Sequence, residues 1–253
     1  MQKNQTKEKL KAGETVFGSF VRYPDPALIE FLGYQGWDFL VFDAEHGTIE
    51  PRDCENMTRS AELRGVTPIV RVTTNLQPII LRFLDTGAQG VLVPWVQSSV
   101  EAKAAVDSIK YYPLGIRGLA GVRAADFGQT KSLGDYVQEA NSETLVVLQI
   151  ETFQAIEQLP EILKINEIDV IFIGPSDLSQ SMGLPGQGQH PKVQDAMQRI
   201  ADCVSQSEAA LGLMVRNPET ALEWKEKGAR FIAIALESVL GPATKNYLSQ
   251  VRS

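Results

Sequence analysis

Two acidic side chains follow long apolar runs in the second half of the chain, where they could bind a metal ion. Glu151 ends the run LVVLQIE, with Gln149 two residues before it, and Asp177 follows the run DVIFIGPS. Carboxylates held at the ends of consecutive strands suit a hard cation such as Mg²⁺ or Mn²⁺, with Co²⁺ and Zn²⁺ as further options. Two protein ligands leave positions that the keto and carboxylate oxygens of a 2-oxo acid can fill. The alternative is an acid pair bonded to helix N-termini or to an arginine.

A second group of ionisable residues follows an earlier apolar run, in the segment DAEHG. It contains Asp43 and His46, and His46 is one of only two histidines in the chain. A neutral imidazole can accept a proton near pH 7, and Asp43 could orient the ring. The alternative is a lone surface histidine. The other histidine, His190 in QHPKV, is expected to cap a helix that begins at Pro191.

Three further polar residues are candidates for contact with substrate or with a reacting group. Arg71 ends the run PIVR, where a guanidinium can grip a carboxylate or stabilise a developing enolate; the alternative is a salt bridge. The turn GPSDLS, which contains Ser176, can bind an anion, but without a GK[ST] ending it is a weak signal for a nucleotide. Asp85 lies late in an expected helix, where the helix dipole disfavours a negative charge.

Short apolar runs alternate with helix-like stretches along the whole chain. Runs without polar interruptions are typical of parallel strands that are buried on both faces. Strict strand–helix alternation over 253 residues predicts a single (β/α)₈ barrel spanning residues 1–253. A Rossmann sheet is the main rival, and the lack of GxGxxG after the first strand disfavours it. We expect strands at Phe17–Val21, Asp38–Glu45, Thr67–Val72, Gly90–Val96, Leu145–Glu151, Asp169–Pro175, Ala210–Val215 and Phe231–Ser238.

The barrel prediction brings the candidate residues together. Barrel enzymes carry their catalytic groups at the carboxyl ends of the strands, and the DAEHG segment, Arg71, Glu151 and Asp177 all fall at such ends. A single polar residue there would most simply be a helix cap, but the concentration at several strand ends favours an active site. Two long irregular segments, residues 112–130 and 182–190, are expected to have functional or mobile roles.

Composition narrows the class of protein. The formal charge of −7 argues against nucleic-acid binding that is independent of sequence. Cys54 and Cys203 are far apart and predict packed or surface thiols, not a disulfide framework. The N-terminal segment lacks the apolar core of a signal peptide, and no apolar run approaches the ~20 residues that span a membrane. We therefore expect a cytoplasmic protein that is not bound to a membrane.

Six segments in these regions resemble the HpcH/HpaI aldolase family. This family of metal-dependent, class II pyruvate aldolases includes 4-hydroxy-2-oxoheptanedioate aldolase and 2-keto-3-deoxy-L-rhamnonate aldolase. The resemblance covers nearly the whole chain, and the order and spacing of the segments make it strong. They are GWDFLVFDAEHG, PIVRV, LDTGAQGVLVPWVQ, YYPLGIRG, LVVLQIET and VIFIGPSDLSQSMG.

The resemblance implies roles for individual residues. The divalent metal would be bound by Glu151 and Asp177. His46 would be the proton acceptor, helped by Asp43 and by Asp85, the latter contributed by a neighbouring subunit. Family members commonly have alanine at the position of Ser176, which would contact substrate through its backbone. Arg71 would stabilise the enolate and orient pyruvate, and Gln149 and Asp177 would contact substrate.

The resemblance also has consequences for assembly and specificity. Family members are hexamers in which the last helix packs on a neighbouring barrel, and Glu237–Ser253 would supply that helix. The segment LAGVRAADFGQT, which follows GIRG, fits the family pattern less closely. We expect it to shape the pocket for the acceptor aldehyde.

The predicted reaction is aldol cleavage or condensation of 4-hydroxy-2-oxo acids, giving pyruvate and an aldehyde through a metal-stabilised enolate. No lysine falls at the relevant strand ends, so a Schiff base is not expected. Two other enzymes on the same scaffold remain alternatives, a 2-oxo acid decarboxylase and a lyase acting on a CoA ester. A non-catalytic barrel that binds a metal or metabolite is the alternative from another class.

Overall fold

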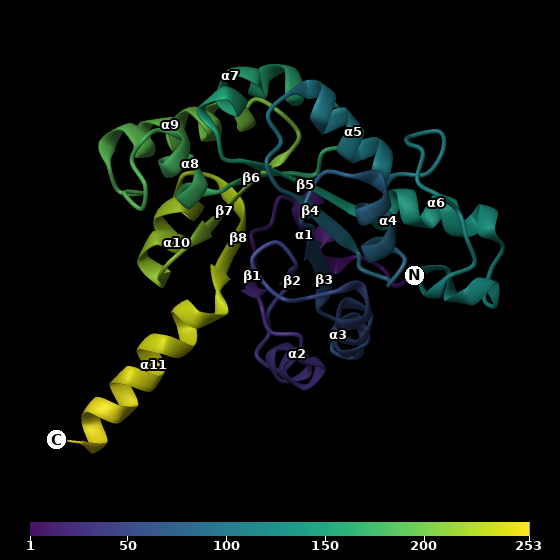
Figure 1. Ribbon diagram of the computed structural model, residues 1–253, viewed down its shortest axis with the longest axis horizontal. Coiled ribbons are helices and arrows are strands. Elements are labelled where there is room, and N and C mark those ends of the chain that lie inside the picture. The colour runs from purple at the N-terminus through teal and green to yellow at the C-terminus, as the bar shows by residue number, and fades with distance from the viewer. Residues whose placement is uncertain (253) are drawn as a thin grey trace.

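The computed structural model describes residues 1–252 and contains a closed barrel of eight parallel strands surrounded by helices (Figure 1). Each strand pairs with the next along the chain, and β8 closes the barrel on β1. The predicted (β/α)₈ barrel is therefore confirmed. The strands are β1 Val16–Val21, β2 Phe39–Asp43, β3 Thr67–Arg71, β4 Gly90–Val93, β5 Leu145–Ile150, β6 Val170–Ile173, β7 Ala210–Val215 and β8 Ala229–Ala235.

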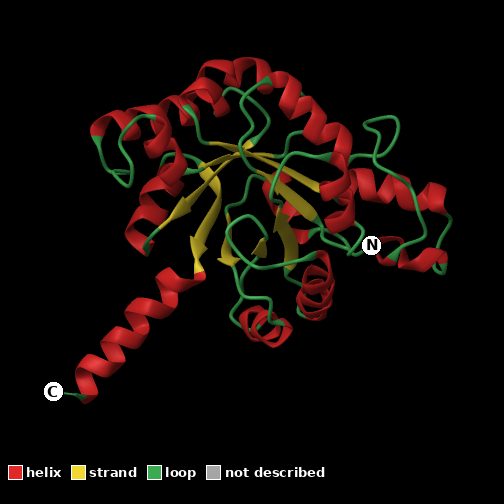
Figure 2. Ribbon diagram, viewed as in Figure 1, coloured by secondary structure: helices red, strands yellow, loops and turns green. Residues whose placement is uncertain are grey.

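The helices lie mostly outside the barrel, between successive strands (Figure 2). Several begin where proline follows a capping residue: Asp25 caps α2 and Asn217 caps α10 through their side chains. The helices are α1 Gln5–Lys11, α2 Pro26–Gly33, α3 Pro51–Leu63, α4 Gln77–Leu84, α5 Ser99–Ile109, α6 Leu133–Glu143, α7 Phe153–Ile162, α8 Pro175–Ser181, α9 Pro191–Val204, α10 Pro218–Glu226 and α11 Leu236–Val251, with the 3₁₀ helix η1 at Arg123–Gly128.

The expected strands are all present, but several end earlier than predicted. The last strand was expected to continue to Ser238, which is wrong, since β8 ends at Ala235 and α11 starts at Leu236. Likewise, β4 ends at Val93 and β6 at Ile173. The residues that follow these ends have left the strand ladder, so their backbone groups do not pair with a neighbouring strand there.

The core has two layers, one on each side of the strands. Inside the barrel, aromatic rings fill the centre: Phe39 stacks on Phe231 with ring centroids 4.0 Å apart, and Phe172 meets Phe231 edge-on. Outside, aliphatic side chains from the strands pack against the apolar faces of the helices. Both strand faces are covered, which accounts for the near-continuous apolar runs in the sequence.

Helix α1 covers the amino end of the barrel. The Thr6 hydroxyl donates to Thr67 Oγ1 (2.8 Å) at the start of β3, and the Lys7 ammonium pairs with Asp169 (3.0 Å) just before β6. The carboxyl end lies on the other side of the barrel. We call this carboxyl end the mouth, since the ionisable residues that follow the strands gather there.

Helix α11 extends away from the barrel as an arm (Figure 1). Leu236 is the buried residue of this helix, whereas Leu240, Tyr247 and Val251 are all largely exposed. The helix predicted for the C-terminal segment is confirmed over Glu237–Val251. Among residues 1–252, no helix has the length and apolar character needed to cross a membrane.

Candidate active site

A buried ion pair forms one side of the mouth. Asp43 ends β2 and Arg71 ends β3, and these two positions are neighbours in the strand register. Arg71 grips Asp43 with two hydrogen bonds, from Nε to Oδ1 (2.9 Å) and from Nη2 to Oδ2 (2.6 Å). Burial opposes the charge on Asp43, but the hydrogen bonds and charge of Arg71 outweigh it, so the pKa of Asp43 lies below its usual value. The pair therefore remains charged at neutral pH and fixes the guanidinium.

The same guanidinium reaches a second carboxylate. Arg71 Nη1 lies 3.2 Å from Glu45 Oε2, and the guanidinium carbon lies 5.0 Å from the centre of the Phe20 ring. Burial raises the pKa of Glu45, although Arg71 and His46 partly oppose that shift. Arg71 is thus held between two acids and an aromatic face, with its side chain only 5% exposed.

Glu151 occupies a tight polar niche on the other side of the mouth. The backbone amide of Trp95 donates to its Oε1 (2.7 Å), and the Gln149 side-chain amide donates to its Oε2. Trp95 adopts a left-handed backbone conformation (φ 55°), which is uncommon for a non-glycine residue. At Gly174, a β-carbon would come within 2.6 Å of Glu151 Oε2, so only glycine leaves room for the carboxylate there.

Three carboxylates of the mouth influence one another electrostatically. Burial raises the pKa of Glu151 to about 7; the donors Trp95 and Gln149 oppose this shift, while the charges of Asp177 and Glu45 add to it. The charge of Asp177 also raises the pKa of Glu45. Like charges held this close disfavour one another, and a bound cation would relieve the conflict.

The residues around Glu151 fit a divalent cation. The donor set is carboxylate oxygen from Glu151 and Asp177, and Gln149 Oε1 is buried without a hydrogen-bond partner in the part of the chain described. Within residues 1–252, no group of three or more His, Cys, Asp and Glu side chains is arranged to hold a metal ion. Two carboxylates, Glu151 and Asp177, would therefore be the protein ligands of the cation, and its other coordination positions would be left for oxygens of substrate or water.

The structure places His46 at the mouth but gives Asp43 a different contact from the one expected. Asp43 Oδ1 accepts from the backbone amide of His46 (3.1 Å), whereas His46 Nε2 lies 4.0 Å from Glu45 Oε2. The expectation that Asp43 orients the ring is wrong here, because both its oxygens are engaged by Arg71, Arg22 and the His46 backbone. The imidazole instead faces outward, with the side chain 54% exposed.

Ser176 and Asp177 lie in the first turn of α8, which follows β6 at the mouth. Ser176 is exposed, and its carbonyl oxygen accepts from the Ser179 hydroxyl (2.7 Å). Backbone amides in the first turn of a helix have no acceptor within that helix, so they are available to a ligand. The expected backbone contact of Ser176 with substrate stays a prediction.

Asp85 and the segment 112–130 lie away from the mouth of their own chain. Asp85 caps the C-terminal end of α4, which faces the amino end of the barrel, and pairs with Arg117 (2.9 Å). The backbone amide of Ala124 donates to the Asp85 carbonyl (3.3 Å), and Arg123 pairs with Glu62 near the end of α3. Within one chain this segment lies at the side of the barrel opposite the mouth, because helices that run antiparallel to the strands end there; the expectation that it shapes the aldehyde pocket stays a prediction.

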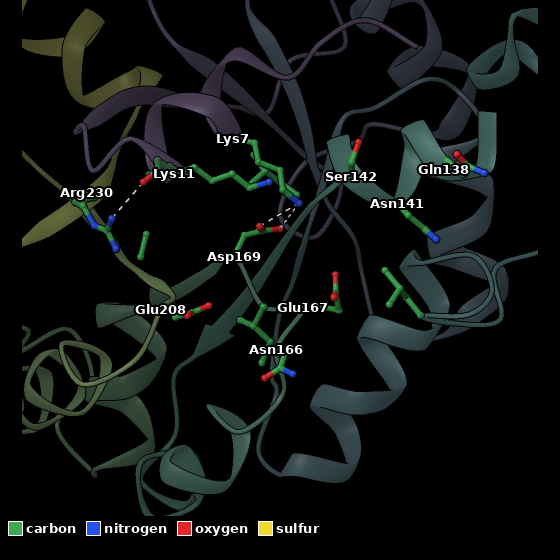
Figure 3. A pocket seen from close by; sticks show the side chains of 15 residues that line it. Lys7, Lys11, Gln138, Asn141, Ser142, Asn166, Glu167, Asp169, Glu208 and Arg230 are labelled. Atoms are coloured by element: carbon green, nitrogen blue, oxygen red, sulfur yellow. Dashed lines mark hydrogen bonds and ion pairs between the residues drawn. The ribbon is translucent and has the colours of Figure 1, made fainter. Parts of the chain in front are cut away.

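The amino end of the barrel has a pocket of its own (Figure 3). Lys7 and Asp169 lie side by side in it, with Glu167 and Glu208 close by. Behind it, Lys110 is fully buried, donates to the carbonyl oxygens of Asn141 and Thr144, and has a pKa lowered to about 8 by burial. A lysine of that kind could form a Schiff base, but this one lies at the end of the barrel opposite the mouth.

Four residues at the mouth were not predicted as site residues from the sequence: Glu45, Arg22, Trp95 and Gly174. Glu45 lies within DAEHG and could have been found by its position after a strand. Arg22 donates from Nε to Asp43 Oδ2 (3.2 Å) and follows β1 directly, so the strand-end rule also covers it. Trp95 acts through its backbone and Gly174 through the absence of a side chain, and neither leaves a signal in residue type.

The two remaining expectations for individual residues are confirmed. His190 caps α9, its Nδ1 accepting from the backbone amide of Lys192 (3.2 Å). Cys54 and Cys203 are both free. Burial raises the pKa of Cys54 to about 11, so that thiol is not an activated nucleophile.

Comparison with known proteins agrees with this geometry. Residues 17–241 match the sequence profile of the HpcH/HpaI aldolase/citrate lyase family. A 4-hydroxy-2-oxo-heptane-1,7-dioate aldolase of Escherichia coli is 35% identical over 237 residues, covering 94% of this chain and 90% of the relative. A hydroxypyruvate/pyruvate aldolase of Sagittula stellata is 34% identical over 239 residues, covering 94% and 93%. A solved structure of an HpcH/HpaI aldolase/citrate lyase family protein from Burkholderia cenocepacia J2315 has a TM-score of 0.94 at 31% identity, covering 99% of this chain and 100% of that one.

The barrel and its acidic mouth define an enzyme of the TIM-barrel class whose ionisable groups meet at the strand ends. The chain belongs to the HpcH/HpaI aldolase/citrate lyase family. It is a carbon–carbon lyase of the aldolase type.

Proposed function

We propose that this enzyme cleaves 4-hydroxy-2-oxo acids to pyruvate and an aldehyde, and runs the reverse condensation, with the help of a divalent cation such as Mg²⁺ or Mn²⁺. The observation that carries the proposal is the coupling of Glu151, Asp177 and Glu45 beside the fixed Arg71 at one mouth. The relatives named as aldolases of 4-hydroxy-2-oxo-heptane-1,7-dioate and of hydroxypyruvate and pyruvate support this substrate class.

Glu151 and Asp177 would hold the cation, and Gln149, whose Oε1 lacks a partner, would lie next to it. When bound, such a cation supplies Lewis acidity toward the keto oxygen of the substrate. Arg71 would orient the pyruvate portion and stabilise the enolate. Two of its five N–H donors bond to Asp43, and Nη1 forms an ion pair with Glu45, so further donors are left for the substrate.

His46 would accept the proton of the C4 hydroxyl when the C3–C4 bond breaks. Its ring is exposed at the mouth and close to Glu45, so a proton can pass from the substrate to the imidazole directly or through a water. Ser176 would contact the substrate through its backbone amide. The buried Asp43 would fix both Arg71 and the turn that carries His46.

Removal of metal tests the proposed function directly. We expect chelation to lower pyruvate release from a 4-hydroxy-2-oxo acid by at least about tenfold, and Mg²⁺ or Mn²⁺ to restore it. The measurement is a coupled assay of pyruvate before and after dialysis against EDTA. Activity that resists EDTA but is abolished by borohydride in the presence of pyruvate would contradict the proposal, because that result indicates a Schiff base.

Metal binding is expected to depend on pH through Glu151. Since its pKa is about 7, a cation that binds below that pH must displace a proton. The apparent affinity for Mn²⁺ should rise by up to about tenfold per pH unit below about pH 7 and level off above it. Titration calorimetry at several pH values measures this; an affinity that is constant from about pH 5 to about pH 8 would show that Glu151 is not a ligand.

The raised pKa of Glu151 also determines how the free energy of unfolding of the metal-free protein changes with pH. The folded pKa of Glu151 is above the ordinary 4.5, so the folded state binds the proton more tightly than the unfolded state. Its contribution to stability is present below about pH 4.5 and is lost as the pH rises through about 7. Divalent cation should consequently raise the melting temperature most at and above neutral pH.

Replacement of His46 tests the proton acceptor. His46→Ala should lower kcat by about a hundredfold, because a general base contributes roughly that much. The fold should persist, since the side chain is exposed. Steady-state kinetics at saturating divalent cation gives the measurement. A kcat within twofold of the parent enzyme would remove His46 from the reaction.

We further propose a homo-oligomer in which α11 docks on a neighbouring barrel. The exposed Leu240, Tyr247 and Val251 on the arm support this, because an isolated helix with apolar residues in water lacks the packing that stabilises it. In such an assembly, Asp85 of one copy can lie near the mouth of another. A hexamer is the state that the family resemblance favours.

A further inference from the structure

A second pocket lies beyond the carboxyl ends of the neighbouring strands β6 and β7, among the segments that follow them and the helices α9 and α10. Its volume is ≈ 720 Å³, and it begins at Ser176, the residue before Asp177. From there it passes the end of β7 and reaches the first turns of α9 and α10. Ser176 thus belongs to the lining of this pocket and directly precedes Asp177, the proposed cation ligand.

The lining of this pocket contains no carboxylate among the described residues, although the whole chain carries a net charge of −7. It contains one arginine, Arg216, which directly follows β7 and is exposed. Within residues 1–252, Arg216 makes no hydrogen bond or ion pair, unlike Arg71, Arg117 and Arg123, which are all paired with acids. An unpaired guanidinium in an acid-free pocket can bind an anion such as a carboxylate.

The rest of the lining suits a short carbon chain that ends in a polar group. Met197, Met214 and Trp224 provide apolar surface, and Gln187, Gln194 and Asn217 provide amide groups. The His190 ring lines the pocket as well, and because Nδ1 accepts a hydrogen bond, the ring proton is on Nε2, which can donate. The pocket at the amino end differs, because it contains carboxylates as well as cations. Its charged lining residues are Glu167, Asp169, Glu208, Lys7, Lys11 and Arg230 (Figure 3).

We propose that this pocket binds the far end of the acceptor aldehyde, and that Arg216 selects acceptors that carry a carboxylate there. This inference rests on the proposed aldolase reaction, since it assigns a binding pocket to the aldehyde portion of the substrate. The aldehyde carbon lies toward Ser176 and Asp177, the methylene chain lies along Met214, and the terminal carboxylate meets Arg216 beyond the end of β7.

The test compares two aldehydes of equal chain length, succinic semialdehyde with a terminal carboxylate and uncharged butanal, in condensation with pyruvate. Arg216→Gln should lower kcat/KM for succinic semialdehyde by about tenfold to a hundredfold, mainly through KM, as expected for loss of one hydrogen bond to a charged group. It should change kcat/KM for butanal by less than about twofold. Arg216→Lys should recover part of the preference, because it retains the charge.

The matched control is Arg59→Gln, which removes an equal charge from the outer face of α3, where Arg59 pairs with Glu55. This control should leave both aldehydes unaffected. Equal losses for both aldehydes in Arg216→Gln, or no loss for either, would overturn the assignment of Arg216.

A reaction without aldehyde separates this inference from the proposed function. Enolate formation exchanges the methyl protons of pyruvate with deuterons of D₂O, and NMR can follow that exchange. The buffer contains Mg²⁺ and no Mn²⁺, because paramagnetic Mn²⁺ broadens the signals. Exchange should be the same in the parent enzyme and in Arg216→Gln. If the parent enzyme shows no exchange, the proposed function fails; if exchange is normal but the preference for succinic semialdehyde is absent in the parent, only the pocket assignment fails.

Discussion

Glu151→Gln is expected to lower kcat/KM for cleavage of a 4-hydroxy-2-oxo acid by about a thousandfold at saturating divalent cation, the loss of roughly 4 kcal/mol of stabilisation. The amide keeps the shape of the carboxylate but removes the negative oxygen that the proposed cation requires. The new amide oxygen can still accept from the Trp95 backbone amide, and the Gln149 side-chain amide can turn so that its Oε1, which has no partner in the parent, accepts from the new NH₂ group. The measurement is steady-state kinetics with Mg²⁺, combined with calorimetric titration of Mn²⁺.

The control for this variant is Glu161→Gln, which makes the same chemical change at an exposed carboxylate on α7 that pairs with Lys164. It should leave kinetics and metal affinity unchanged. Because burial raises the pKa of Glu151 to about 7, the parent carboxyl is partly protonated at neutral pH, and a neutral amide should not unfold the protein. A Glu151→Gln enzyme with kinetics within tenfold of the parent would show that this residue is not at the reacting centre.

Arg71→Met is expected to lower kcat/KM by about a hundredfold to a thousandfold, the range for loss of a donor to a developing oxyanion. It should also destabilise the protein by about 3–5 kcal/mol, because Asp43 would remain charged and fully buried without its main partner. Kinetics at saturating metal and urea denaturation measure the two effects separately.

A double variant separates the chemical role of Arg71 from its structural role. Arg71→Met with Asp43→Asn removes both charges of the buried pair, so most of the lost stability should return. Activity should not return, because the substrate would still lack the guanidinium. Recovery of activity together with stability would mean that Arg71 only supports the fold.

The fold could be predicted because two signals mark each strand: an apolar run in the sequence and the helix-like stretch that follows it. The ends were less predictable, since the residues after Val93 and Ile173 remain apolar or small for a few positions while the backbone has already left the ladder. At the C-terminus, Leu236 continues the apolar pattern of β8 but starts a helix, and residue type alone does not mark that change.

The candidate site was predictable where a side chain acts through its charge. Arg71, Glu151 and Asp177 follow strands, and the strand-end rule brings them to one mouth. The interactions were less predictable, because Asp43 could pair with the His46 ring or with Arg71 and only the geometry decides between them. The position of segment 112–130 was not predictable for a similar reason, since its Gly-rich composition indicates a long loop but not the end of the barrel at which it lies.

Arg22 connects helix α11 to the buried carboxylate Asp43 at the mouth. Its Nε bonds to Asp43 (3.2 Å), while its Nη1 lies 3.5 Å from Glu237 in the first turn of α11. Any displacement at the root of the arm thus changes the surroundings of the carboxylate that holds Arg71. A truncated variant of this protein should therefore end after the first turn of α11 and not before it, so that the ion pair between Arg22 and Glu237 is kept.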